Sequence, residues 1–336
     1  MTVTASPIIP VVARHPLLLS RSVDPIVTSD DGTQSVIDPE TLQPVDQGLA
    51  TDGSGTDFDV AAIIWLAWSL AVGIPLALAG IRLWRLTTGV SLGIAFSVCV
   101  WAAFINTISA SGLSDLVLTC IVMGAFVLGF AVGVFEIGRL AGISFLGILG
   151  GFSIAVRIVL FRDGLLAPPF FANWLICTAF GIAGFVLVVL RQRAAIVISS
   201  ASVGTFLTAL GIDLILNRQK GMSTGLRFLF DRNNHHLIDI FSRGWHPPLM
   251  TIIIMAASLG LIPILAYGQH RIFKRPFKPE RPSSALYSVT DGEESYPQSG
   301  EVNNEGAHSR MALLEEKEPQ TPSPQPQERS SSRFSM

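Results

Sequence analysis

The chain is poor in charge, in cysteine and in glycosylation signals. Only 14% of its 336 residues are charged, whereas a soluble domain carries about 25%. The formal net charge of −2 argues against a chain-wide positive field for nucleic acid. The three cysteines, Cys99, Cys120 and Cys177, lie inside apolar runs, so neither a disulfide framework nor a metal-ligand spacing is indicated. No Asn-x-Ser/Thr acceptor occurs in the chain.

Long apolar runs are what the sequence has in abundance. A helix needs about 20 apolar residues to cross a bilayer core of about 30 Å, and seven stretches reach or approach that length. None alternates apolar and polar residues as a strand of a membrane barrel does. Because unpaired backbone groups are not tolerated in lipid, each stretch is predicted to be a helix. The predicted spans are Val60–Ile81, Gly89–Ile108, Leu116–Phe135, Leu140–Phe161, Phe170–Leu190, Ala194–Leu216 and Leu249–Gly268.

The composition divides the chain into three parts. Residues 60–270 are predicted to form an all-α domain of seven transmembrane helices. Residues 1–59 read as an acidic, disordered N-terminal tail, since positions 23–59 contain neither Lys nor Arg. Residues 271–336 read as a basic juxtamembrane stretch followed by a tail rich in Pro, Ser, Glu and Gln, which cannot bury enough apolar surface to fold.

Basic residues gather at alternate ends of the predicted spans. Five lie in the connectors between spans one and two, three and four, and five and six, and five more lie in residues 271–281, which makes ten on one side. The other side has six. The positive-inside rule then predicts a cytosolic C-terminus and an N-terminus that is outside or lumenal, in a plasma membrane or an endomembrane. The connector arginines are Arg82, Arg85, Arg139, Arg191 and Arg193.

Three arginines recur at an interval of 54 residues, and a small residue follows each of them eight positions later. We interpret this spacing as three repeated helical hairpins, each turning at a basic connector, followed by a seventh span. Chance similarity between apolar segments is the alternative. The pairs are Arg85 and Gly93, Arg139 and Gly147, and Arg193 and Ala201.

Glycines spaced four apart line several predicted spans. Helices in lipid approach closely where small residues face each other, so we expect these glycines to pack the helices of one chain together. The predicted packing glycines are Gly89, Gly93, Gly129, Gly133, Gly147 and Gly151.

Two charged residues, Arg157 and Asp213, fall within spans. They lie 18 and 20 residues beyond Arg139 and Arg193, which is about 27 and 30 Å along a helix. Their similar depth allows a salt bridge or a shared polar pocket, and an intramembrane charge is a functional candidate. The favoured alternative is that Arg157 snorkels to the headgroups while Asp213 lies in interfacial water.

The loop between the last two spans carries apolar residues at helical spacing. We predict an amphipathic helix in the interface, interrupted at Asn233 and Asn234. Its histidines and acid are interpreted as a solvated polar face rather than as a metal site, because three or four converging ligands are needed. These residues are His235, His236, Asp239 and His246.

Three segments carry a family resemblance: GIRLWRLTTGVSLG, GRLAGISFLGILGG and RAAIVISSASVGTFLTALGIDLIL. Over about residues 60–270 the chain resembles the domain shared by transmembrane protein 198 and transmembrane 7 superfamily member 3. The most specific matches are Gly80, Arg82, Leu83, Arg85 and Leu86, and later Gly211, Ile212 and Asp213. Fungal chains with similar tails look like part of the same group. The resemblance implies seven spans and no established catalytic chemistry, and some animal members are linked to membrane-proximal signalling or stress responses.

These features predict a non-enzymatic multi-pass membrane protein that acts as a scaffold or a signalling-associated component. Its expected partners are the lipid bilayer and cytosolic proteins bound through the C-terminal tail, with no nucleic acid and no cofactor. The alternative is a small-solute or ion transporter or channel whose polar path passes Arg157 and Asp213. GVSLG fits the G-x-S-x-G hydrolase pattern, but that motif requires a preceding strand, so no catalytic residue is predicted.

Overall fold

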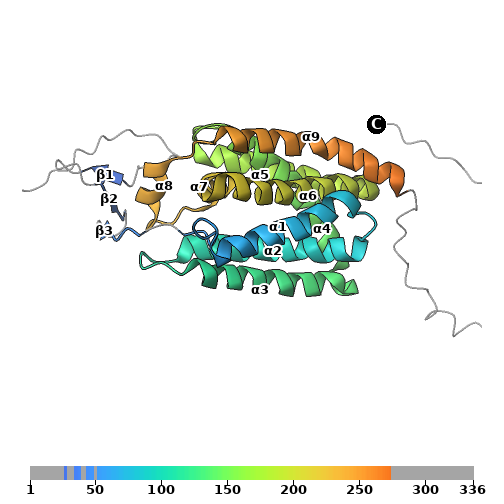
Figure 1. The fold of residues 1–336 in the computed structure, drawn as a ribbon, viewed down its shortest axis with the longest axis horizontal. Helices are drawn as coiled ribbons and strands as arrows, with labels where there is room; N and C mark the ends of the chain where they lie inside the picture. Colours follow the sequence, from blue (N-terminus) through green and yellow to red (C-terminus); the bar gives the residue numbers. More distant parts are fainter. Residues whose placement is uncertain (1–25, 29–33, 39–42, 49–50, 274–336) are drawn as a thin grey trace, which may run out of the picture. The chain divides into compact units, whose positions relative to one another are not determined.

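The computed structural model describes residues 26–28, 34–38, 43–48 and 51–273. Within these residues, seven helices are long and apolar enough to cross a membrane, which confirms the predicted fold class. They are α1 (Val60–Ala79), α2 (Trp84–Thr107), α3 (Asp115–Val134), α4 (Glu136–Leu160), α5 (Phe170–Leu190), α6 (Gln192–Asn217) and α9 (Leu249–Ile272) (Figure 1). The predicted C-terminal tail from residue 274 onward lies outside the described residues.

Short polar or proline-containing signals begin several of these helices. The Asp59 carboxylate accepts a hydrogen bond from the Ala62 amide at 2.8 Å and so caps α1, and Ser114 caps α3 in the same way. Pro169 and Pro248 directly precede α5 and α9, where a missing amide proton costs nothing. The starts of these four helices therefore follow from local sequence.

Glycine brings pairs of helices into backbone contact. A Cβ atom added to Gly129 in α3 would lie 2.7 Å from the backbone oxygen of Leu92 in α2, and one added to Gly151 in α4 would overlap the backbone oxygen of Phe180 in α5. All six predicted packing glycines lie at such helix–helix contacts within the chain. They are Gly89, Gly93, Gly129 and Gly133 between α2 and α3, and Gly147 and Gly151 between α4 and α5.

The closest helix pairs differ from the predicted hairpins. The most extensive packing is of α2 along α3, α1 along α6 and α4 along α5, whereas α1 and α2 are joined by a short connector without packing side by side. The loops 108–114 and 161–169 close the α2–α3 and α4–α5 pairs at the ends away from the arginines. The α2–α3 and α4–α5 pairs therefore each begin at an arginine connector instead of turning there, and α1 packs along α6.

Residues that the sequence assigns to the N-terminal tail form three short strands and a segment that leads into α1. Strands β1 (Ile26–Thr28), β2 (Gln34–Ile37) and β3 (Pro44–Val45) form an antiparallel sheet in that order. Val36 pairs with Ile26 on one side and with Val45 on the other. Residues 51–59 then lead into α1.

Two short helices replace the single amphipathic helix predicted between the last two spans. They are α7 (Met222–Phe230) and α8 (Leu237–Arg243), and the interruption includes Asn233 and Asn234 as predicted. Leu229 and Ile240 are buried in the same apolar core as the α4 residues Val156 and Leu160. This segment therefore packs against the spans themselves.

Candidate functional site

Arg157 lies in the interior of the helix bundle. Its side chain is fully buried, and Nη2 donates to the backbone oxygen of Ser202 at 2.8 Å and to Oγ1 of Thr205 at 3.0 Å. The guanidinium carbon also lies 5.2 Å from the centroid of the Phe206 ring. The favoured prediction that Arg157 snorkels to the headgroups is therefore wrong, because α6 offers acceptors and an aromatic face at the depth of this side chain.

Asp213 joins three helices near the end of α6. Its Oδ1 accepts hydrogen bonds from Thr251 Oγ1 at 2.7 Å and from Asn217 Nδ2 at 2.8 Å, and its Oδ2 accepts one from the backbone amide of Met222. The residue is 1% exposed, so its expected position in interfacial water is wrong. By accepting from the first residue of α7 it satisfies a backbone donor that a helix leaves unpaired.

The two intramembrane charges serve separate networks. Arg157 contacts α6 at the Ser202 turn, whereas Asp213 contacts the starts of α7 and α9. Within the described residues no ion pair joins them. The two residues therefore stabilise different contacts between helices.

The segment Asp52–Ser54, which we name the plug, is held against the helices by tryptophan and hydroxyl donors. The indole of Trp65 in α1 donates to Gly53 O at 3.0 Å, and the indole of Trp101 in α2 donates to Asp52 O at 2.8 Å. Thr119 Oγ1 also donates to Gly53 O, at 2.6 Å. Sequence reasoning missed this plug because its polar composition suggested disorder.

A cavity of about 160 Å³ lies beneath the plug. Residues of α1, α2, α3, α4, α6 and α7 line it, and most of these are apolar or aromatic. Asp52 and Ser54 belong to its wall, and the Asp52 carboxylate accepts a hydrogen bond at 2.7 Å from Ser223 in α7. The plug and α7 therefore form part of the wall of this largely apolar cavity between the spans.

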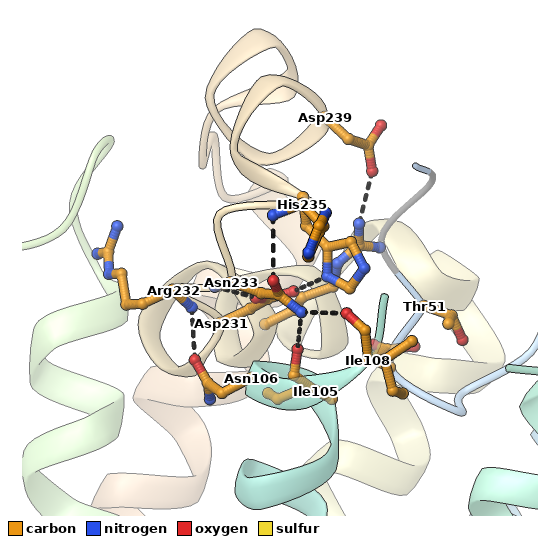
Figure 2. Close-up of polar contacts among 12 residues, drawn as sticks. Thr51, Ile105, Asn106, Ile108, Asp231, Arg232, Asn233, His235 and Asp239 are labelled. Carbon is orange, nitrogen blue, oxygen red and sulfur yellow. Dashed lines mark hydrogen bonds and ion pairs between the residues drawn. The ribbon is translucent and has the colours of Figure 1, made fainter. Parts of the chain in front are cut away.

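A polar network joins the segment between α7 and α8 to the end of α2 (Figure 2). Asn233 Nδ2 donates to the backbone oxygens of Ile105 and Ile108, which the end of α2 leaves unpaired. Asn106 Oδ1 accepts from the backbone amide of Arg232 at 2.9 Å. Figure 2 also shows His235 next to this network, where its own backbone oxygen accepts from Gly48 N at 2.9 Å.

Arg232 projects from this network onto an aromatic face. Its guanidinium carbon lies 3.1 Å from the centroid of the Phe170 ring. Burial lowers the pKa of Arg232 to about 10, and the nearby Asp231 carboxylate opposes that shift. The side chain therefore stays protonated at neutral pH, and it pins the start of α5 to the α7–α8 segment.

The histidines of this segment point to separate partners. His236 Nδ1 lies 3.1 Å from the Asp231 carboxylate with both side chains buried, and His235 Nδ1 lies 2.9 Å from the backbone oxygen of Asp46. Asp239 forms ion pairs with Arg227 and Arg243. In the described part of the chain no three His, Cys, Asp or Glu residues are grouped as a metal site would require.

The connector arginines lie at one end of the bundle. The guanidinium carbons of Arg85 and Arg139 lie 5.3 and 5.6 Å from the Trp84 ring, and Arg193 Nη2 donates to the backbone oxygen of Phe273 at 2.7 Å. Arg82 lies 6.0 Å from the Phe273 ring, and Arg191 is the residue between α5 and α6. These contacts bring the first two basic connectors together and tie the third to the end of α9.

Comparison with families of known proteins gives one match. A family model described as the TM7S3/TM198-like domain matches residues 66–269, which is more than half of the chain. The matched range includes Arg157, Asp213 and most of the residues that line the cavity, whereas Asp52, Ser54 and Trp65 lie before it. No curated protein and no solved structure matches the chain.

Proposed function

The chain belongs to the TM7S3/TM198-like domain family, and from this premise we propose that it is a non-enzymatic membrane component that organises cytosolic partners as a scaffold or in signalling. The observation that supports this proposal best is the use of both intramembrane charges in fixing the helices. Arg157 binds α6, and Asp213 binds the starts of α7 and α9. A chain that uses these charges to fix its own helices is suited to a stable platform.

The cytosolic C-terminal segment is the proposed binding element. Residues 271–281 contain five basic side chains, which favour an anionic lipid surface by about 1 kcal/mol each. The residues beyond them are polar and proline-rich, a composition that suits partner binding by an extended chain. The basic stretch would hold this tail at the membrane while the tail recruits proteins.

The proposed orientation rests on the ten basic residues at the connector end and the C-terminal flank, against six at the other end. Single cysteines in a background without Cys99, Cys120 and Cys177 test it. An impermeant maleimide added to intact cells should label Ser111→Cys, in the loop between α2 and α3, and not Arg191→Cys. The reverse labelling would place the C-terminus outside.

Proximity labelling from the C-terminus tests the scaffold. Two truncations distinguish the proline-rich tail from the basic stretch. A stop after Arg281 removes the proline-rich tail, and a stop after Phe273 also removes most of the basic stretch. We expect both to insert normally, the first to lose its cytosolic partners, and the second also to bind anionic vesicles less tightly. An unchanged partner set after the first truncation would contradict the scaffold.

The cavity of about 160 Å³ favours a second candidate, a small-solute transporter. In reconstituted vesicles, a transporter that uses the predicted pair would change its flux on Arg157→Gln or Asp213→Asn. Flux must first be measured in the parent protein, and these variants must be compared at equal amounts of folded protein. Because the two residues fix different helices, we expect them to alter stability and not to open or close a path.

A further inference from the structure

Three tryptophan indoles border the same cavity, and two of them have acceptors. Trp65 donates to Gly53 O and to Thr119 Oγ1, at 3.0 and 3.1 Å, and Trp101 donates to Asp52 O at 2.8 Å. Both indoles therefore hold the plug in place. A buried indole N–H normally finds a partner of this kind.

The third indole, that of Trp68, has no hydrogen-bond acceptor within the described residues. Trp68 lines the cavity three residues after Trp65 in α1. Its Nε1 is buried, and no hydrogen-bond acceptor for it is found in the part of the chain that the structure describes. Its ring packs edge-on against Trp65 and Phe126, with centroids 5.6 and 5.2 Å apart, so the indole is held firmly. An unpaired buried donor costs about 1–3 kcal/mol.

Ser69 follows directly in the sequence and lines the same cavity. It is 2% exposed, and no hydrogen bond of its hydroxyl is found within the described residues. The other cavity serines of the spans have partners: Ser97 Oγ donates to Val122 O at 3.2 Å, and Ser153 Oγ lies 2.7 Å from Ser202 Oγ. The unused hydrogen-bonding capacity of the cavity wall is thus concentrated on α1.

We propose that this cavity is a binding site for a small, neutral, mainly apolar molecule that carries one hydrogen-bond acceptor. The acceptor oxygen receives the Trp68 indole N–H, and the Ser69 hydroxyl is available as a second donor. The apolar body contacts the rings of Phe152, Phe206 and Phe230, which line the cavity. Small-molecule sites combine the same elements, an apolar wall with few placed polar groups.

The size of the cavity sets the size of the ligand. An apolar protein cavity of about 150 Å³ accommodates benzene, and this one is of similar volume. A six-membered ring with a carbonyl oxygen fits that space. The site is independent of the tails on which the proposed scaffold depends, so the failure of one proposal leaves the other standing.

The test uses the full chain in detergent micelles with ¹⁵N-labelled tryptophan, whose six indole N–H signals are observed by NMR. The probe is cyclohexanone, and the matched control is methylenecyclohexane, which replaces the carbonyl oxygen by a CH₂ group. Cyclohexanone should move the Trp68 indole proton downfield in a saturable way, because that proton gains an acceptor. The indole protons of Trp65 and Trp101 should move less, because they already have acceptors.

Two variants connect the response to the cavity. Trp68→Phe identifies the signal and should weaken cyclohexanone binding about three- to tenfold, as expected for the loss of one hydrogen bond, while leaving methylenecyclohexane unaffected. Val203→Phe fills the cavity from α6 and should abolish saturable binding. Val189→Phe, which adds the same ring at an exposed position of α5, is the control.

Two outcomes would overturn the proposal. In the first, the shift rises linearly with probe concentration and is similar for all six indoles, as partition into the micelle would produce. In the second, the Trp68 signal is downfield before any probe is added and does not respond, as a bound water that satisfies the indole would produce. Because Val203→Phe should keep the Trp65 and Trp101 signals of the seated plug, its folding is checked in the same spectrum.

Discussion

The two ends of the helix bundle are built differently. At the connector end, short turns join the spans. Arg85 and Arg139 lie against the Trp84 ring, and Arg193 donates to the backbone oxygen of Phe273 at the end of α9. At the opposite end, Asp213 and Asn233 are buried and donate or accept hydrogen bonds across several elements.

This difference separates two uses of polar residues in a membrane protein. Arginines beside short turns set orientation through the membrane, and Arg82, Arg85 and Arg191 are exposed. The buried carboxyl and amide groups of the other end are consumed by the fold, because each satisfies backbone donors or acceptors that helix ends leave unpaired. The comparison predicts that stability depends on one end and topology on the other.

The largest effect should come from Asp213→Ala. It removes the acceptor of the buried Thr251 hydroxyl and of the Met222 amide, while Asn217 Nδ2 keeps only its bond to Thr251 Oγ1. We therefore expect a loss of about 4 kcal/mol in unfolding free energy. Thermal unfolding in detergent measures it. Asp163→Ala, at an exposed carboxylate near the same end, should change stability by less than about 0.5 kcal/mol. Equal effects of the two substitutions would remove the distinction between buried and exposed charge at that end.

Gly151→Ala tests whether glycine packing in the middle of the bundle contributes to stability as much as the buried polar groups do. The added methyl group would overlap the backbone oxygen of Phe180, so α4 and α5 must separate, at a cost of about 2 kcal/mol. Gly260→Ala in α9 is the matched control, because an added Cβ there meets nothing within 4 Å. Its stability should stay the same or rise by about 0.5 kcal/mol. A Gly151→Ala protein as stable as this control would show that the backbone contact is dispensable.

Asp52→Ala tests whether the Asp52 carboxylate holds the plug against the helices. Alanine removes the carboxylate that accepts hydrogen bonds from Ser223 Oγ and from the amide and hydroxyl of Ser54, and we expect a local loss of about 1 kcal/mol. The indole protons of Trp65 and Trp101, which donate to the plug, should then exchange faster with solvent. Asp46→Ala is the control, because Asp46 contacts His235 through its backbone oxygen, which alanine keeps. Unchanged exchange in Asp52→Ala would mean that the carboxylate does not hold the plug.

The smallest effect on stability should come from the connector arginines. Arg85→Gln and Arg139→Gln each lose a contact with the Trp84 ring, worth about 0.5 kcal/mol at an exposed site. The double variant should unfold almost as the parent does, yet a fraction of molecules should insert in the reverse orientation, measured by labelling of Ser111→Cys. A large loss of stability with unchanged orientation would show that the connector end determines stability and not topology.

Several features could be read from residues in sequence, and others could not. The spans follow from runs such as Phe170–Leu190, since hydrophobic length alone decides whether a helix can cross lipid. The glycine faces follow from their spacing. The contacts of the plug could not be predicted, because Asp52, Gly53 and Ser54 have the composition of a disordered segment and the tryptophans that donate to their backbone lie elsewhere in the sequence.

The amino-acid sequence by itself determined the number of spans, the small-residue faces of the helices and the gathering of arginines at alternate span ends, because these depend on local composition and spacing. Tertiary structure decided which helices pair, where Arg157 and Asp213 find partners, and how the plug and the cavity form. Those outcomes depend on contacts between residues far apart in the chain, such as Trp101 with Asp52 and Asp213 with Thr251. Hydrogen bonding across such distances leaves no periodic signal in a sequence.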